Sequence, residues 1–195
     1  MHKGTVVVLT LLAGVVVVAG IAAALIYSGS YNIGADVPHT GPIFALLETA
    51  RTHSIRAHAQ YLEVPSDLNS NRRVSSGAAE YGEMCSQCHL APGMERTEIS
   101  KGLYPAAPEL ARGDALSPAE QFWVIKHGIK FTAMPAWGPT HDEDLIWDIV
   151  AFVRRLPALH ATQYRSFVAQ APEEHANMMH RDPMMRGMPM QKDAK

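Results

Sequence analysis

The sequence has little of three things that mark common protein classes: cysteine, aromatic side chains and net charge. Its 195 residues include two cysteines, 7% aromatic residues and a formal net charge of -2. No run of lysine and arginine occurs, and the aromatic residues are not interleaved with basic ones, so the sequence predicts no nucleic-acid interface. The length is that of one or two compact units.

One long hydrophobic run lies near the N-terminus. Residues 5–27 contain no charged side chain and are rich in Val, Leu, Ile and Ala. As a helix at about 1.5 Å per residue they extend roughly 34 Å, which is enough to cross a hydrocarbon core of about 30 Å. We therefore predict a transmembrane anchor. A cleaved signal peptide is the alternative, because residues 22–24 and Ser28 are small enough to form a cleavage site.

The charges on either side of this run predict its orientation. Lys3 precedes it, and the next Lys or Arg is Arg51. Basic residues remain on the cytoplasmic side of a membrane span. We therefore expect residues 1–4 to be a short cytoplasmic tail and the rest of the chain to lie outside the cytoplasm.

The rest of the chain favours helices joined by loops rich in glycine and proline. No alternating pattern typical of strands appears, so the predicted fold class is all-α. An irregular linker is expected at 28–42. Helices are expected at 43–62, at 75–85 with Ser75 or Ser76 as its cap, at 117–128 after the cap Ser117, and from Asp142 or Asp144 to Pro157.

Both cysteines lie in one short motif, Cys85-Ser86-Gln87-Cys88-His89. This pattern is the signature of covalent haem attachment, in which the cysteines bond the porphyrin vinyl groups and the histidine binds the iron. A zinc knuckle and a redox dithiol are alternatives, but the sequence offers neither the further cysteines nor the βαβ context that they need. We predict one covalently bound haem c, attached by Cys85 and Cys88, with His89 as an iron ligand.

A second axial ligand is expected downstream of His89. Met134 lies in a loop beside Pro135, and methionine–histidine ligation raises the haem potential and suits electron transfer. His127 and His141 are the alternative ligands. If protein fills both axial positions, none is open to a substrate. We therefore expect an electron carrier and not an enzyme.

These residues resemble the class I c-type cytochromes over about residues 72–158. Gly77 and Tyr81 match the small and aromatic residues that precede the attachment motif in that family. Ile149 and Phe152 match the aliphatic and aromatic pair of its C-terminal helix. The resemblance implies that these two helices cross closely at the glycine. We place the cytochrome c domain at residues 72–160.

The resemblance also implies roles for residues in the loops. Pro108, in the segment Pro108-Glu109-Leu110, matches a family proline whose carbonyl accepts a hydrogen bond from Nδ1 of the haem-binding histidine. Met134-Pro135 matches the family's methionine loop. Trp137 is expected either to donate to a haem propionate or simply to pack.

The combined pattern predicts a single-pass protein of the bacterial inner membrane, with its haem domain on the periplasmic side. It would pass single electrons to or from a redox protein partner in a respiratory chain. The alternative is a cytochrome subunit of a larger membrane oxidoreductase, either a dehydrogenase or a haem–copper oxidase. Residues 28–71 would form a linker and an accessory helix that docks a partner or packs on the domain.

The C-terminal extension, residues 161–195, ends in a segment rich in methionine and histidine. Its low aromatic content predicts disorder from residue 173 onward. Thioether and imidazole groups suit copper, so weak copper binding by this tail is one hypothesis, and a tail without a metal function is the other. If the tail binds copper, a copper-handling protein is a further alternative for the function of the chain. The candidate copper ligands are His175, Met178, Met179, His180, Met184, Met185, Met188 and Met190.

Overall fold

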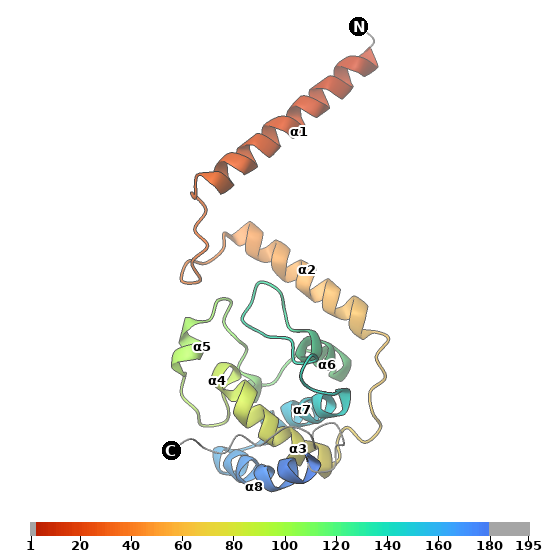
Figure 1. The fold of residues 1–195 in the computed structure, drawn as a ribbon, viewed down its shortest axis with the longest axis vertical. Coiled ribbons are helices and arrows are strands. Elements are labelled where there is room, and N and C mark those ends of the chain that lie inside the picture. The colour runs from red at the N-terminus through yellow and green to blue at the C-terminus, as the bar shows by residue number, and fades with distance from the viewer. Residues whose placement is uncertain (1–2, 180–195) are drawn as a thin grey trace. The chain divides into compact units, whose positions relative to one another are not determined.

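The computed structural model describes residues 3–179, and over that range it is helical and contains no strand (Figure 1). The all-α prediction is confirmed. The chain divides into two compact units, residues 1–37 and residues 38–195. The α-helices are α1 Lys3–Tyr27, α2 Gly41–Ala59, α3 Asn71–Glu80, α4 Ser86–His89, α5 Glu98–Gly102, α6 Pro118–His127, α7 Glu143–Arg155 and α8 Ala161–Met179.

Helix α1 is the main element of the first unit. It has 25 residues, none of them buried, and by length and composition it can cross a membrane. A signal sequence near an N-terminus meets the same criteria. The helix therefore agrees with the predicted anchor and leaves the alternative of cleavage open.

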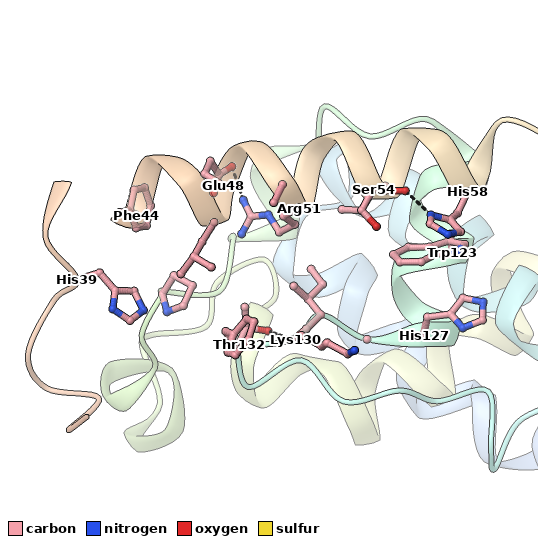
Figure 2. Close-up of a pocket in the computed structure, with 17 residues that line it drawn as sticks. His39, Phe44, Glu48, Arg51, Ser54, His58, Trp123, His127, Lys130 and Thr132 are labelled. Carbon is pink, nitrogen blue, oxygen red and sulfur yellow. Dashed lines mark hydrogen bonds and ion pairs between the residues drawn. The ribbon is translucent and has the colours of Figure 1, made fainter. Parts of the chain in front are cut away.

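Helix α2 packs against α6 in the second unit. Pro42 lies in its first turn, where a missing backbone N–H costs nothing. Near its C-terminal end, the His58 ring stacks on Trp123 of α6 with ring centroids 5.3 Å apart, as Figure 2 shows. Arg56 pairs with Glu120 at 3.8 Å. The accessory helix thus packs on the domain that follows it in the chain.

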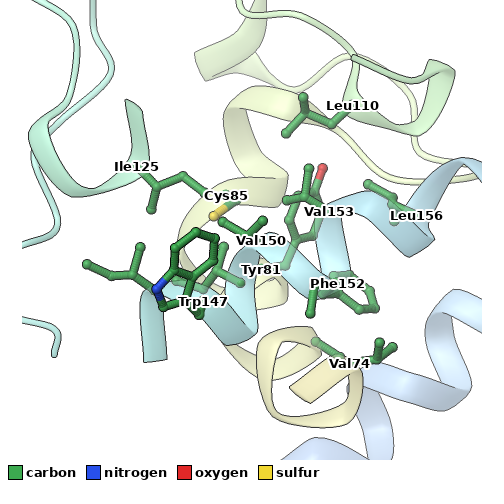
Figure 3. Packing of buried hydrophobic residues seen from close by; sticks show 14 of the residues in the cluster. Val74, Tyr81, Cys85, Leu110, Ile125, Trp147, Val150, Phe152, Val153 and Leu156 are labelled. Atoms are coloured by element: carbon green, nitrogen blue, oxygen red, sulfur yellow. The ribbon is translucent and has the colours of Figure 1, made fainter. Parts of the chain in front are cut away.

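The core of the second unit forms where α3 crosses α7 (Figure 3). A Cβ on Gly77 would lie 1.9 Å from the carbonyl oxygen of Asp148, so only glycine permits this separation of the two backbones. Tyr81 and Phe152 meet beside the crossing, with ring centroids 5.4 Å apart. Helix α6 joins the core through Phe122, which stacks on Trp147 at 4.2 Å.

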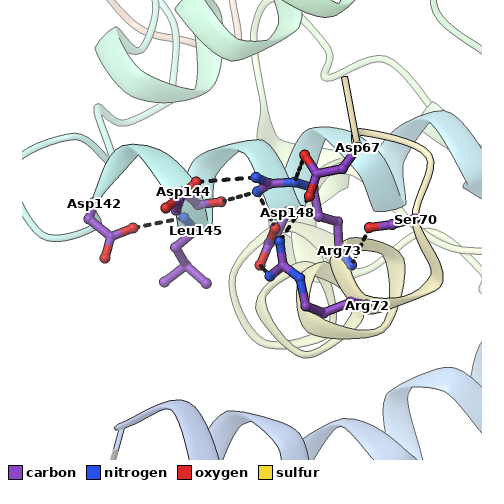
Figure 4. A network of polar contacts seen from close by, with 8 residues as sticks. All are labelled: Asp67, Ser70, Arg72, Arg73, Asp142, Asp144, Leu145 and Asp148. Carbon is purple, nitrogen blue, oxygen red and sulfur yellow. Dashed lines mark hydrogen bonds and ion pairs between the residues drawn. The ribbon is translucent and has the colours of Figure 1, made fainter. Parts of the chain in front are cut away.

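An ion-pair network built around a buried pair, Arg73 and Asp148, also joins α3 to α7 (Figure 4). Arg73, whose side chain is 7% exposed, contacts Asp148 at 2.8 Å, Asp67 at 2.9 Å and Asp144 at 3.2 Å. Asp148 is 3% exposed and also lies 3.7 Å from Arg72. Because a buried charge is costly unless it is paired, this network ties the start of α3 to the first half of α7.

Several predicted helix boundaries were wrong. Helix α3 begins at Asn71, because the Ser70 hydroxyl accepts the Arg73 backbone N–H; neither Ser75 nor Ser76 is its cap. Helix α2 spans 41–59, where we expected 43–62. The short α5 and the whole of α8 were missed, and α8 extends through residues 173–179, for which disorder was predicted. Helix α6 has the expected cap Ser117, which forms a capping box with Glu120, and Asp142 caps α7.

Candidate haem site

The Cys-x-x-Cys-His motif begins at the last residue of a π-helical turn. Helix α3 continues into a π-helical turn, Tyr81–Cys85, and then into α4, which ends at His89. Such turns re-aim side chains and are frequent at functional sites. Cys85 is buried and Cys88 is half-buried, and both are free thiols. The pKa of the Cys85 thiol is raised to about 12, mainly by burial and in second place by the nearby Glu80.

The imidazole of His89 is held by the loop that precedes residues 110–112. Its Nδ1 lies 2.9 Å from the carbonyl oxygen of Pro108. A carbonyl only accepts, so Nδ1 carries the proton and Nε2 keeps its lone pair. Burial lowers the pKa of His89, although the Pro108 contact acts in the opposite direction. With Nδ1 occupied by the Pro108 carbonyl, Nε2 is the nitrogen that His89 can offer to a metal.

The chain turns sharply directly after His89. Leu90 has φ 59°, a left-handed conformation that is unfavourable for a residue with a side chain. Two contacts hold it there: its N–H donates to Ser86 at 2.9 Å, and its carbonyl accepts the Tyr81 hydroxyl. Tyr81 is fully buried in the core. The turn that directs His89 is thus anchored on the crossing of α3 and α7.

The loop that carries Met134 packs on the C-terminal end of α6. Gly128 has φ 64°, and a Cβ there would lie 2.7 Å from the Met134 carbonyl oxygen. The backbone N–H of Met134 donates to the Thr132 hydroxyl at 3.1 Å, and its carbonyl accepts from Ile129 at 3.2 Å. The Met134 side chain is half-buried against the hydrophobic cluster that includes Cys85. The sequence motif and this loop therefore share one cluster.

The two alternative ligands have other neighbours. His127 lies beside Trp123, with ring centroids 5.1 Å apart, on the face of α6 that α2 covers. His141 lies edge-on to Trp137 at 5.4 Å and 3.6 Å from the Glu80 carboxylate. Trp137 itself is half-buried against the core. Met134 stays the predicted second ligand, with His127 and His141 as the alternatives.

The residues present fit covalently bound haem. Cys85 and Cys88 are free thiols three residues apart, and the imidazole of His89, oriented by its hydrogen bond, follows them directly. The thioether of Met134 packs against the hydrophobic cluster that includes Cys85. The π-helical turn, the left-handed Leu90 and the close approach at Gly128 were missed from the sequence, although glycine directly after a helix was a visible signal at residue 128. The candidate copper ligands of the C-terminal tail lie outside the residues whose side chains the structure describes.

An all-α domain with this motif and this helix crossing is a class I c-type cytochrome domain. Residues 72–153 match the family model described as cytochrome c oxidase, cbb3-type, subunit III. This match begins where the sequence resemblance was expected to begin. The domain carries one covalently attached haem c, and its role is electron transfer. No curated protein and no solved structure matches the chain.

Proposed function

We propose that this chain is a membrane-anchored, single-haem electron carrier that works on the periplasmic side of a bacterial inner membrane. Cys85 and Cys88 form the thioether bonds to haem, and His89 and Met134 bind its iron. Helix α1 remains uncleaved and holds the domain at the membrane. Haem iron with two protein ligands supplies one-electron exchange and has no position for a substrate.

The observation that carries this proposal is the hydrogen bond between His89 and Pro108 at 2.9 Å. It fixes the imidazole plane and the tautomer, and it increases the basicity of the remaining nitrogen. A structural zinc site would need further ligands, and no group of three or more His, Cys, Asp or Glu side chains gathers among the described residues. The donor set therefore supports haem ligation.

The other residues of the domain keep this ligand set in place. Tyr81 and Leu90 fix the turn after His89. Gly128 lets the Met134 loop lie against α6. Trp137 donates its backbone N–H to Ile125 at 3.1 Å, which ties the far end of that loop to the same helix. Both ligand-bearing segments thus rest on the α3–α6–α7 core.

Paired cysteine variants test the attachment. The unaltered chain, expressed with haem-attachment machinery, should retain haem after denaturation, with one haem per chain. Cys85→Ala with Cys88→Ala should lose all covalent haem. Ser86→Ala, a change inside the same motif, should keep it. Covalent haem in the double variant would refute the assignment.

A subunit of a larger membrane oxidoreductase is the second candidate. The matched family is described as a subunit of a cbb3-type oxidase, and this observation favours such an assembly. Solubilisation in mild detergent followed by purification through a C-terminal tag tests it. Stable co-purification of oxidase chains at constant ratio would identify a subunit. A chain that purifies alone and still exchanges electrons with soluble redox proteins would be a free carrier.

A further inference from the structure

A cavity of about 710 Å³ lies between α2 and the cytochrome domain (Figure 2). Helix α2 lies over it, and contacts at both ends of the cavity hold the segment 39–58 on the domain. At one end, the backbone N–H of His39 donates to the Tyr104 hydroxyl at 2.9 Å. At the other end, His58 stacks on Trp123 at 5.3 Å. Between these two contacts the helix and the domain leave an open space.

Two walls of this cavity belong to the loops that position the proposed iron ligands. One wall includes Pro105, three residues before the Pro108 carbonyl that holds His89. The other wall is the segment 128–132, which leads directly into Met134. Thr132 lines the cavity, and its hydroxyl accepts the Met134 backbone N–H at 3.1 Å. The cavity therefore adjoins both loops of the candidate haem site.

The lining of the cavity is apolar with a basic component. Helix α2 contributes a stripe of side chains, Phe44, Leu47, Arg51, Ile55 and His58, which are spaced three or four residues apart and so share one face. Arg51 is the one permanent cation in that stripe, and Figure 2 shows it on the side of α2 that faces the loop of Thr132. Lys130 adds a second cation from the domain, and Glu48, which pairs with Arg51, is the acidic residue of the lining.

We propose that this cavity receives the carboxylate edge of the haem, and that Arg51 of the accessory helix, together with Lys130, is its counter-ion. Haem has an apolar ring and two carboxylates, which matches an apolar cavity with cations. A carboxylate that leaves bulk water needs a paired cation, and arginine is suited to the bidentate contact. Helix α2 precedes the family-matched region, residues 72–153, so this contact is an addition to the cytochrome domain. The inference rests on the proposed haem attachment.

A positive charge near the iron favours the reduced state, because reduction lowers the charge of the iron. Arg51→Gln should therefore lower the midpoint potential, and Glu48→Gln should raise it, because it removes the opposing charge. We expect the reduction equilibrium to change by a factor of about three to ten in each case, and a tenfold change is about 59 mV for a one-electron couple. If the two substitutions only loosened helix α2, the midpoint potentials of both variants would shift in the same direction.

The test is a spectroelectrochemical titration of the full, haem-loaded chain in detergent. Arg56→Gln is the matched control, because Arg56 is on the same helix but lies outside the cavity lining. Its side chain is 69% exposed and pairs with Glu120. The midpoint potential of the haem in this variant should therefore be unchanged. Arg51→Lys should restore most of the unaltered potential. Shifts of opposite sign in Arg51→Gln and Glu48→Gln, with no shift in Arg56→Gln, support the proposal.

Three results would overturn it: no shift in Arg51→Gln, shifts of the same sign in the Arg51 and Glu48 variants, or an equal shift in the Arg56 control. The covalent haem content of each sample separates this inference from the proposed function. Full haem content with an unchanged potential refutes the role of Arg51 alone. Absence of covalent haem from the unaltered chain refutes the attachment and this inference with it.

Discussion

Gly77 of α3 lies directly against the backbone of Asp148 in α7, with space for a hydrogen and not for a methyl group. A Cβ at residue 77 would be 1.9 Å from the Asp148 carbonyl oxygen and 2.9 Å from the Ile149 nitrogen. Both obstacles are backbone atoms, so no side-chain rotation can relieve the clash. The close approach of the two backbones at this point therefore requires glycine at residue 77.

Gly77→Ala should therefore destabilise the domain. The two helices must separate, which weakens the packing of Tyr81 on Phe152, and overpacking of a core typically costs about 1–3 kcal/mol or more. Denaturant unfolding of the haem-loaded chain, followed by haem absorbance, gives the free-energy difference. Gly102→Ala is the control, because no atom lies within 4 Å of a Cβ at that position. An equal effect in both variants would contradict the close-contact explanation.

The Arg73 network should respond very differently to two neighbouring substitutions. Arg73→Met removes the 2.8 Å partner of Asp148, a carboxylate only 3% exposed, and uncompensated buried charges cost about 3–5 kcal/mol. Arg72→Met removes a side chain that is 58% exposed and 3.7 Å away, so less than about 1 kcal/mol should be lost. The same unfolding measurement compares them. Equal losses would show that Asp148 does not depend on Arg73.

Asp67 should make the stability of this network depend on acid. The hydrogen bond from Arg73 at 2.9 Å lowers the pKa of the Asp67 carboxyl below its ordinary value. A lowered pKa means that the charged carboxylate stabilises the fold above the ordinary value of about 3.9, and that this stabilisation is lost as the pH falls through the folded-state pKa. Asp67→Asn should thus be less stable than the unaltered chain at pH 7. The difference between the two unfolding free energies should narrow below about pH 4, and a constant difference would argue against the ion pair.

Local signals in the sequence located the helices whose ends are capped by nearby residues. Ser117 and Glu120 form a reciprocal capping box, and Asp142 caps α7, because both interactions span only three residues. Ser70 was missed because three serines lie close together there and the sequence does not distinguish them. Packing against α3 stabilises α8, and the apolar stripe Tyr164, Phe167 and Val168 was the signal that could have revealed it.

The candidate site also has parts that the sequence predicts and parts that only three-dimensional packing brings together. The attachment motif could be predicted because its residues are contiguous. The contact between His89 and Pro108, which the structure contains, could be predicted because the family resemblance links those two positions. The cavity under α2 joins residues 39, 51, 105 and 132, which are far apart in the sequence. Neither periodicity nor motif spacing brings such residues together. Their arrangement follows only from how α2 and the two loops pack in three dimensions.

Met134 is predicted to be the second iron ligand, and a comparison of two methionines tests this directly. Met94 and Met134 are both half-buried against the core, so the loss of either side chain costs similar packing energy. Met134→Ala should remove the weak near-infrared band of methionine-ligated ferric haem and lower the midpoint potential, because methionine ligation raises it. Met94→Ala should keep the band. If the unaltered chain lacks this band and Met134→Ala leaves its spectrum unchanged, Met134 is not the ligand, and His127→Ala and His141→Ala then identify which side chain binds the iron.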